Sequence, residues 1–180
     1  MQQMELAVLD WIQACVRTPF LDRVVPAFTQ LSNHGEIWIA MAVLLMLWKK
    51  TRKAGLSVSC GLLLDLLTVN MLLKPLVGRV RPFAVNTAVQ LLVEAPHDAS
   101  FPSGHTGVSF AAVGALYASG SPLWKPASVL AALMALSRLY LYVHWPSDII
   151  GGVIVGWLCG WLGAKLVKLA AEAIAKRKTN

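Results

Sequence analysis

Five long apolar runs, separated by short polar or basic connections, constrain the fold of this chain more than any other feature of its sequence. They cover residues 35–48, 54–73, 104–119, 123–142 and 148–171. A helix needs about 20 apolar residues to cross the hydrocarbon core of a bilayer, and lipid admits only segments whose backbone groups are hydrogen-bonded internally. The first run has 14 residues, so its helix would have to begin near residue 29 to cross. The sequence therefore predicts an all-α integral membrane helical bundle with about five transmembrane helices.

The composition supports a membrane location. Of 180 residues, 57% are hydrophobic and 14% are charged, which is too apolar for an ordinary soluble domain, and the length permits a single domain, 1–180. The net charge of +7 could indicate nucleic acid, but the basic residues lie between and after the apolar runs rather than on one polar face. We therefore expect membrane lipids, and no nucleic acid, as partners. The cysteines lack paired or zinc-type spacing and are expected to be small core residues: Cys15, Cys60 and Cys159.

The first 33 residues have a different pattern from the rest of the chain. Residues 4–16 and 21–31 each carry apolar residues at helical spacing, and Thr18-Pro19 separates them. Segment 1–33 is therefore predicted to form one or two amphipathic helices, with residues 34–175 forming the main helical bundle. Lying at the membrane surface and packing against the bundle are equally compatible with this pattern. No basic stretch precedes an apolar one, so we expect no cleavable signal and insertion through the internal spans.

The basic residues predict the orientation of the bundle. If the five spans alternate, ten lysines and arginines fall on one side and six on the other. The side with more basic residues is usually cytoplasmic. We therefore expect a multi-pass protein of the cell membrane with a cytoplasmic C-terminus, and with the polar clusters described next on the extracytoplasmic face.

The first polar cluster is Ala99-Ser100-Phe101-Pro102-Ser103-Gly104-His105-Thr106, which opens directly into the third apolar run. Ser103 is placed to cap a helix start, where free backbone N–H groups and the helix dipole attract an anion such as phosphate. His105, on the first turn, would stand beside that anion, close enough to pass it a proton.

The second and third clusters also lie at the ends of apolar runs. Lys74 and Arg81 are seven residues apart and could hold several oxygens of one phosphate, although snorkelling at the interface is the simpler explanation for such a pair alone. In the third cluster, His144 and Asp148 are four residues apart. A carboxylate that holds one imidazole nitrogen leaves the other free to act as a nucleophile or base.

Asp65 interrupts the second apolar run, and a carboxyl in mid-membrane should face the bundle. Lys74 lies nine positions after Asp65, which on a continuous α-helix places the two on opposite faces. We therefore favour a structural role for Asp65 over direct catalysis. Residues 74–103 form the longest polar connection, and a loop of this length is usually functional or mobile.

Taken together, the three clusters resemble the signature of the type 2 phosphatidic acid phosphatase family, membrane lipid phosphatases that share their active-site pattern with vanadium-dependent haloperoxidases. All three parts of the signature are present in order. The first is Lys74, followed after six residues by Arg81-Pro82, and the second is Pro102-Ser103-Gly104-His105. The third is Ser137-Arg138, followed after five residues by His144 and after three more by Asp148. The resemblance covers residues 74–148.

The resemblance implies a role for each of these residues. His144 would attack phosphorus to give a phosphohistidine, oriented by Asp148, while His105 would protonate the leaving oxygen. The phosphoryl oxygens would be bound by five further residues: Lys74, Arg81, Ser103, Gly104 and Arg138. No cofactor and no metal are expected, and the neighbouring Glu94, His97 and Asp98 are taken as solvated loop residues.

The expected substrate is a phosphorylated lipid. Family analogy and topology favour undecaprenyl diphosphate, the substrate of a bacterial undecaprenyl-diphosphatase, with phosphatidylglycerol phosphate, phosphatidate and lipid A phosphates as alternatives of the same chemistry. Two other classes remain open: a soluble haloperoxidase, disfavoured by the apolar runs, and a lipid transporter or scramblase whose basic groups only bind headgroups. No sequence feature predicts an oligomeric state.

Overall fold

The computed structural model describes residues 2–179, and over this range the chain contains helices and no strands. In chain order the elements are α1 (Gln2–Cys15), α2 (Leu21–Gln30), α3 (Glu36–Leu47), α4 (Arg52–Asp65), the π-helix η1 (Leu66–Leu73), α5 (Lys74–Val77), α6 (Pro82–Val85), α7 (Gly104–Ala118), α8 (Trp124–Tyr140) and α9 (Pro146–Thr179). The predicted all-α class is confirmed.

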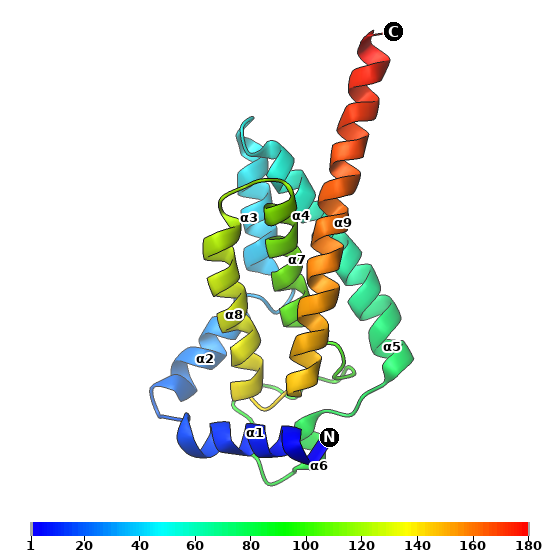
Figure 1. Cartoon of the computed structure of the whole chain (residues 1–180). Coiled ribbons are helices and arrows are strands. Elements are labelled where there is room, and N and C mark those ends of the chain that lie inside the picture. The colour runs from blue at the N-terminus through cyan, green and yellow to red at the C-terminus, as the bar shows by residue number, and fades with distance from the viewer. Residues whose placement is uncertain (1, 180) are drawn as a thin grey trace.

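The long helices run side by side, and α1 lies across one end of the bundle (Figure 1). The α3–α4 and α7–α8 connections and the C-terminus lie at the other end. Helix α7 is the centre of the packing because it contacts α4, α8 and α9, and its contact with α9 is the most extensive in the molecule. Small residues such as Ala111, Ala112 and Ala115 are fully buried along it.

Glycines allow α7 and α9 to touch through their backbones. A Cβ atom on Gly156 would lie 2.1 Å from the carbonyl oxygen of Gly107, and one on Gly160 would lie 2.0 Å from that of Ala111. Both distances are far below van der Waals contact, so no larger residue fits at either position. Close approach through small residues is the usual way in which helices associate inside a membrane.

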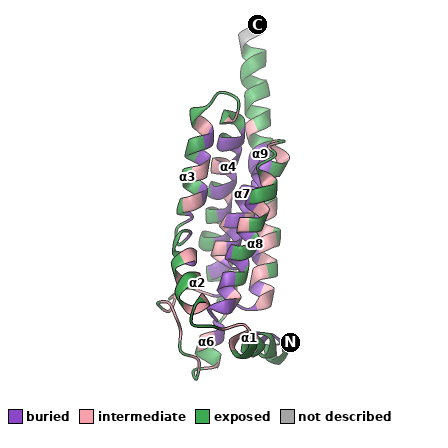
Figure 2. Cartoon of the chain, turned by 90° about the vertical axis from the view of Figure 1, so that its left-hand side faces the viewer, coloured by how far each residue is buried: buried purple, intermediate pink, exposed green. Residues whose placement is uncertain are grey.

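The outer surface of the bundle is apolar. Leu63, Leu67 and Met71 are exposed along α4 and η1, and Ile154 and Leu158 along α9. Figure 2 shows the buried residues along the middle of the bundle and exposed ones outside. Apolar patches of this extent mark a surface that meets lipid or a partner.

Among residues 2–179, two helical stretches are long and apolar enough to cross a bilayer, Arg52–Val85 and Pro146–Arg177. Helices α3, α7 and α8 have 12, 15 and 17 residues. At 1.5 Å per residue, the longest of these three spans about 25 Å of a core that is about 30 Å thick. The count of five transmembrane helices therefore stays a prediction.

Helix α1 packs against the bundle on one side only. Leu9 is fully buried in a cluster with Tyr142 and Trp145, whereas Met4 and Trp11 are exposed. The predicted break at Thr18-Pro19 falls between α1 and α2. Packing against the bundle is therefore observed, and a position at the membrane surface stays a prediction.

The second apolar run differs from the expected straight α-helix. It begins as α4 and continues as the π-helix η1 over Leu66–Leu73. Because a π-helix bonds residue i to i+5, it takes more residues per turn than an α-helix. The prediction that Asp65 and Lys74 lie on opposite faces is therefore wrong, since both line the same cavity.

Candidate active site

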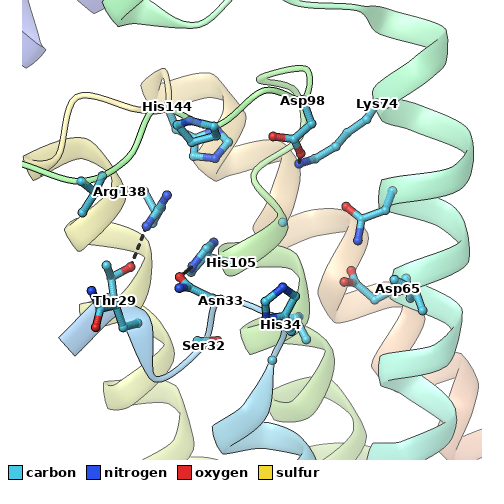
Figure 3. Close-up of a pocket in the computed structure, with 18 of the residues that line it drawn as sticks. Thr29, Ser32, Asn33, His34, Asp65, Lys74, Asp98, His105, Arg138 and His144 are labelled. Carbon is cyan, nitrogen blue, oxygen red and sulfur yellow. Dashed lines mark hydrogen bonds and ion pairs between the residues drawn. The ribbon is translucent and has the colours of Figure 1, made fainter. Parts of the chain in front are cut away.

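The three polar clusters meet at the end of the bundle that α1 crosses. They surround a cavity of about 1010 Å³ (Figure 3). Lys74 reaches it from the end of η1, and Arg138 from the last turn of α8. Six of the eight predicted site residues line this cavity: Lys74, Arg81, Gly104, His105, Arg138 and His144. The two that do not are Ser103 and Asp148.

His144 lies in the short connection between α8 and α9 and is only 2% exposed. Its Nε2 lies 3.2 Å from Nη1 of Arg81, and its Nδ1 lies 3.4 Å from Oδ2 of Asp148. Burial lowers the pKa of His144 to about 3, and the charges of Arg81 and Arg138 add to this effect while Asp148 opposes it. The ring is therefore neutral at neutral pH, and a carboxylate beside Nδ1 favours the tautomer with its lone pair on Nε2, which faces Nη1 of Arg81.

Asp148 lies behind the His144 ring, fully buried. Its Oδ2 accepts hydrogen bonds from Oγ of Ser100 at 2.5 Å and from the backbone N–H of Trp145 at 2.9 Å. Its Oδ1 accepts one from Nη1 of Arg79 at 2.6 Å. These contacts fix the carboxylate in one orientation. Asp148 can therefore orient the ring without touching a ligand in the cavity.

His105 stands on the first turn of α7, as predicted. Figure 3 shows it on the cavity side of the helix, next to Asn33, whose Oδ1 lies 3.3 Å from Nε2 of His105. Asn33 belongs to the α2–α3 connection, so this connection closes the cavity on the side of His105. An amide oxygen at this position can hold one tautomer of the imidazole.

Ser103 is the N-cap of α7, as its position in the sequence predicts. Its Oγ accepts hydrogen bonds from the backbone N–H of Thr106 at 3.5 Å and from Oγ1 of Thr106 at 3.0 Å. Its side chain is fully buried and is not part of the cavity lining. The structure therefore gives Ser103 the role of a cap, and the next residue, Gly104, lies at the cavity in its place.

Lys74 and Arg81 are brought together by Asp98. Arg81 Nη2 donates to Asp98 Oδ1 at 2.6 Å, and Lys74 Nζ bonds to Oδ2. Burial raises the pKa of Asp98, but the hydrogen bonds and charges of Lys74 and Arg81 outweigh this effect and lower it to about 2. Asp98 is exposed, as expected of a loop residue, but its carboxylate also pairs with both cations, which the sequence did not predict.

Arg138 is held by a residue from the N-terminal region. Its Nη1 donates to Oγ1 of Thr29 at 2.6 Å, and Thr29 lies in α2. Within residues 2–179, the buried Nε of Arg138 has no hydrogen-bond partner. The guanidinium thus presents donors that are able to bind an anion in the cavity.

Several residues that position the site were not predicted from the sequence. Ser100, Arg79 and Asp98 lie within or next to the motifs, so their position was a usable signal. Thr29 and Asn33 lie far from the motifs, and nothing in the sequence marks them. Among residues 2–179, no group of three or more His, Cys, Asp or Glu side chains is arranged to hold a metal ion.

The position of Asp98 leads to a prediction about anion binding. Asp98→Asn is expected to lower the inhibition constant of inorganic phosphate several-fold, because the carboxylate neutralises two cations that a phosphate would otherwise bind. The measurement is competitive inhibition of lipid phosphate hydrolysis. Glu172→Gln, on the exposed surface of α9 and outside the cavity lining, is the control and should leave the constant unchanged. An equal or higher inhibition constant for Asp98→Asn would show that the carboxylate does not compete with phosphate.

An all-helical bundle with a cationic cavity, two histidines and a buried carboxylate beside one of them suits the transfer of a phosphoryl group. This chain belongs to the PAP2 superfamily, whose family model matches residues 54–171. It is therefore a hydrolase of the PAP2 phosphatase type. The family resemblance noted in the sequence is confirmed.

Curated relatives act on different lipid phosphates. The chain is 34% identical over 151 residues to an undecaprenyl-diphosphatase of Sulfolobus acidocaldarius, which covers 82% of this chain and 71% of the relative. It is 33% identical over 159 residues to a decaprenylphosphoryl-5-phosphoribose phosphatase of Mycobacterium tuberculosis, covering 87% and 86% of the two chains.

A solved structure has the same fold. The transmembrane PAP2-type phosphatidylglycerolphosphate phosphatase of Bacillus subtilis superposes with a TM-score of 0.74 at 26% identity, covering 96% of this chain and 87% of that one. The names of these similar proteins agree on the chemistry and differ in the lipid.

Proposed function

We propose that this protein hydrolyses undecaprenyl diphosphate to undecaprenyl phosphate at the extracytoplasmic face, through a phosphohistidine on His144. One observation carries the proposal: His144 is buried beside Asp148, and its Nε2 lies at the cavity, 3.2 Å from the guanidinium of Arg81. A neutral imidazole with one nitrogen facing a carboxylate and the other facing an anion-binding cavity suits attack on phosphorus.

The reaction would proceed in two steps. In the first, His144 Nε2 forms a bond to the terminal phosphorus, the bond from phosphorus to the bridging oxygen breaks, and His105 gives a proton to the leaving lipid phosphate. In the second, His105 takes a proton from water, the water oxygen bonds to phosphorus, and inorganic phosphate leaves His144. Positioning and charge stabilisation supply most of the catalysis in such phosphoryl transfers.

Several donors would hold the non-bridging oxygens in both steps. Lys74, Arg81 and Arg138 carry the positive charge around the cavity, and Gly104 adds a backbone N–H at the start of α7. Nζ of Lys74 lies only 3.6 Å from the position of a Cβ on Gly104, so these two donors can reach the same phosphoryl group. Pre-aligned donors of this kind stabilise charge that develops in the transition state.

The similarity to the undecaprenyl-diphosphatase of S. acidocaldarius supports the choice of lipid. A polyprenyl chain also suits the exposed apolar surface of α4 and η1 beside the cavity, where Leu63 and Leu66 line the cavity wall. Phosphatidylglycerol phosphate, phosphatidate and lipid A phosphates are the alternatives within the same chemistry.

The distribution of basic residues supports an extracytoplasmic site. Lys49, Lys50, Arg52 and Lys53 lie at the α3–α4 connection and Lys125 follows the α7–α8 connection, and both connections are at the end of the bundle opposite the cavity (Figure 1). By the positive-inside tendency this end, with the C-terminus, faces the cytoplasm. The cavity would then open on the other face of the cell membrane.

Phosphate release from a panel of lipids tests the proposal. The purified protein in detergent would be given undecaprenyl diphosphate, phosphatidylglycerol phosphate, phosphatidate and lipid A, with and without a chelator. We expect kcat/KM for undecaprenyl diphosphate to exceed the others by about tenfold or more, and the chelator to have no effect, because none of the proposed steps uses a metal. A preference for another lipid would replace the proposed substrate, and loss of activity with chelator would contradict the mechanism.

A further inference from the structure

A chain of ion pairs connects α1 to the carboxylate behind His144. Nη1 of Arg79 donates to Oδ1 of Asp148 at 2.6 Å, and Nη2 of the same guanidinium donates to Oε2 of Glu5 at 2.7 Å. Arg79 therefore bridges two carboxylates that are far apart in the sequence. Asp148 is fully buried and Glu5 is 9% exposed, so both carboxylates are shielded from solvent, while the Arg79 side chain between them is 25% exposed.

Arg79 is fixed by several further contacts and does not reach the cavity. Its guanidinium lies 5.1 Å from the centroid of the Trp145 ring, and its Nη1 also donates to Oγ of Ser147 at 2.6 Å. Its carbonyl accepts a hydrogen bond from the backbone N–H of Ser100 at 2.8 Å. Arg79 is not among the residues that line the cavity. It contacts the site only from behind, through Asp148.

Glu5 connects this network to the start of α9. Its Oε1 accepts hydrogen bonds from the backbone N–H of Ser147 at 2.9 Å and from Oγ of Ser147 at 2.5 Å. Burial raises the pKa of Glu5, but the hydrogen bonds from Ser147 and the contacts with Arg79 outweigh this and keep it below its ordinary value. Glu5 is therefore ionised and balances the charge of Arg79. Leu9, one turn further along α1, anchors the helix against Tyr142 and Trp145.

We infer that Arg79 and Glu5 form a positioning pair for the nucleophile, with Arg79 holding Asp148 Oδ1 so that Oδ2 faces His144 Nδ1, and Glu5 holding Arg79. Without Arg79, one oxygen of Asp148 would lose its partner, and the carboxylate could rotate away from the imidazole. The N-terminal helix is then part of the catalytic apparatus, although it carries none of the family motifs. The inference rests on the proposed phosphohistidine mechanism, in which His144 must be oriented for attack.

Steady-state kinetics test the pair. Arg79→Gln is expected to lower kcat by about 10- to 100-fold, the usual effect of removing a group that orients a reacting residue. KM should stay within about threefold, because Arg79 does not touch the phosphate-binding cavity. Arg79→Lys should recover part of the loss, since an ammonium can still bind one oxygen of Asp148. Arg23→Gln, on the exposed side of α2, is the matched control and should match the wild type.

Glu5→Gln gives a second measurement that does not depend on the folding of Arg79→Gln. It keeps the size of the side chain and is expected to lower kcat by a smaller factor, about three- to tenfold, because Arg79 keeps its bonds to Asp148 and Ser147. A fall in kcat with unchanged KM for Glu5→Gln supports the pair. Wild-type kcat in either folded variant, or a KM that rises in step with the fall in kcat, overturns it.

Rapid acid or alkali quenching with a labelled terminal phosphate separates this inference from the proposed function. Phosphohistidine is stable to alkali and labile to acid, so it can be recognised by its chemistry. If the wild type forms no such intermediate, the proposed mechanism fails. If the wild type forms it and Arg79→Gln forms it at the same rate, the mechanism stands and the positioning role is wrong. We expect the wild type to form it and the variant to form it about 10- to 100-fold more slowly.

Discussion

Replacing His144 with glutamine is expected to lower the rate of phosphate release by about 10⁴-fold or more, the scale of loss seen when a nucleophile is removed. The amide of glutamine can accept the hydrogen bond from Arg81 but cannot form a stable bond to phosphorus. Binding should be retained because Lys74, Arg81 and Arg138 are unchanged. The measurement is phosphate release in detergent, together with the binding of a lipid phosphate and the thermal unfolding midpoint of the variant.

A matched histidine serves as the control for this experiment. The side chain of His34 is 89% exposed at the rim of the cavity and pairs with Glu36, so His34→Gln should keep activity within about threefold of the wild type. If His144→Gln kept a substantial part of the activity, His144 could not be the nucleophile. The phosphohistidine would then have to be abandoned.

Gly156→Val is expected to have the largest effect on folding. The added carbon atoms would meet the backbone of α7, because a Cβ at this position already lies 2.1 Å from the carbonyl oxygen of Gly107. Neither backbone can move aside without breaking the contact between α7 and α9, on which the cavity depends. We expect a loss of more than about 4 kcal/mol, in the exceptional range for one substitution. The measurement is the yield of monodisperse protein after detergent extraction.

Ala170→Val is the control for Gly156→Val. It adds a branched side chain to the same helix at an exposed position. The last turns of α9 extend past the neighbouring helices (Figure 2). Its yield and thermal midpoint should be close to those of the wild type. Normal recovery of Gly156→Val would mean that the backbones of α7 and α9 do not touch as described.

The helices and their boundaries could be predicted well because they depend on local features. The run 104–119 corresponds to α7, Gly104–Ala118, and the run 123–142 to α8, Trp124–Tyr140. Ser103 was identified as the residue before a helix, and it caps α7. Each of these features is determined by residues within a few positions of one another, which is why the sequence alone carries them.

The relations between distant segments could not be predicted in this way. The π-helix η1 turns Asp65 toward the same cavity as Lys74, and the sequence of the second run contains no signal for it. Thr29 and Asn33 reach the site only because α2 and its connection to α3 fold against α7 and α8. Such contacts depend on how the whole bundle packs, so a polar residue in a distant segment gives no sign of them.

The carboxylate of Asp98 between Lys74 and Arg81 has a consequence for selectivity among membrane lipids. Common phospholipids are phosphodiesters with one negative charge on phosphorus, and such a group would replace the single charge of Asp98 with another single charge. A terminal phosphate carries up to two charges and a further oxygen, so it offers both cations a stronger partner. We therefore expect the enzyme to bind the rare lipids that end in a phosphate in preference to the phosphodiester lipids that make up most of the bilayer.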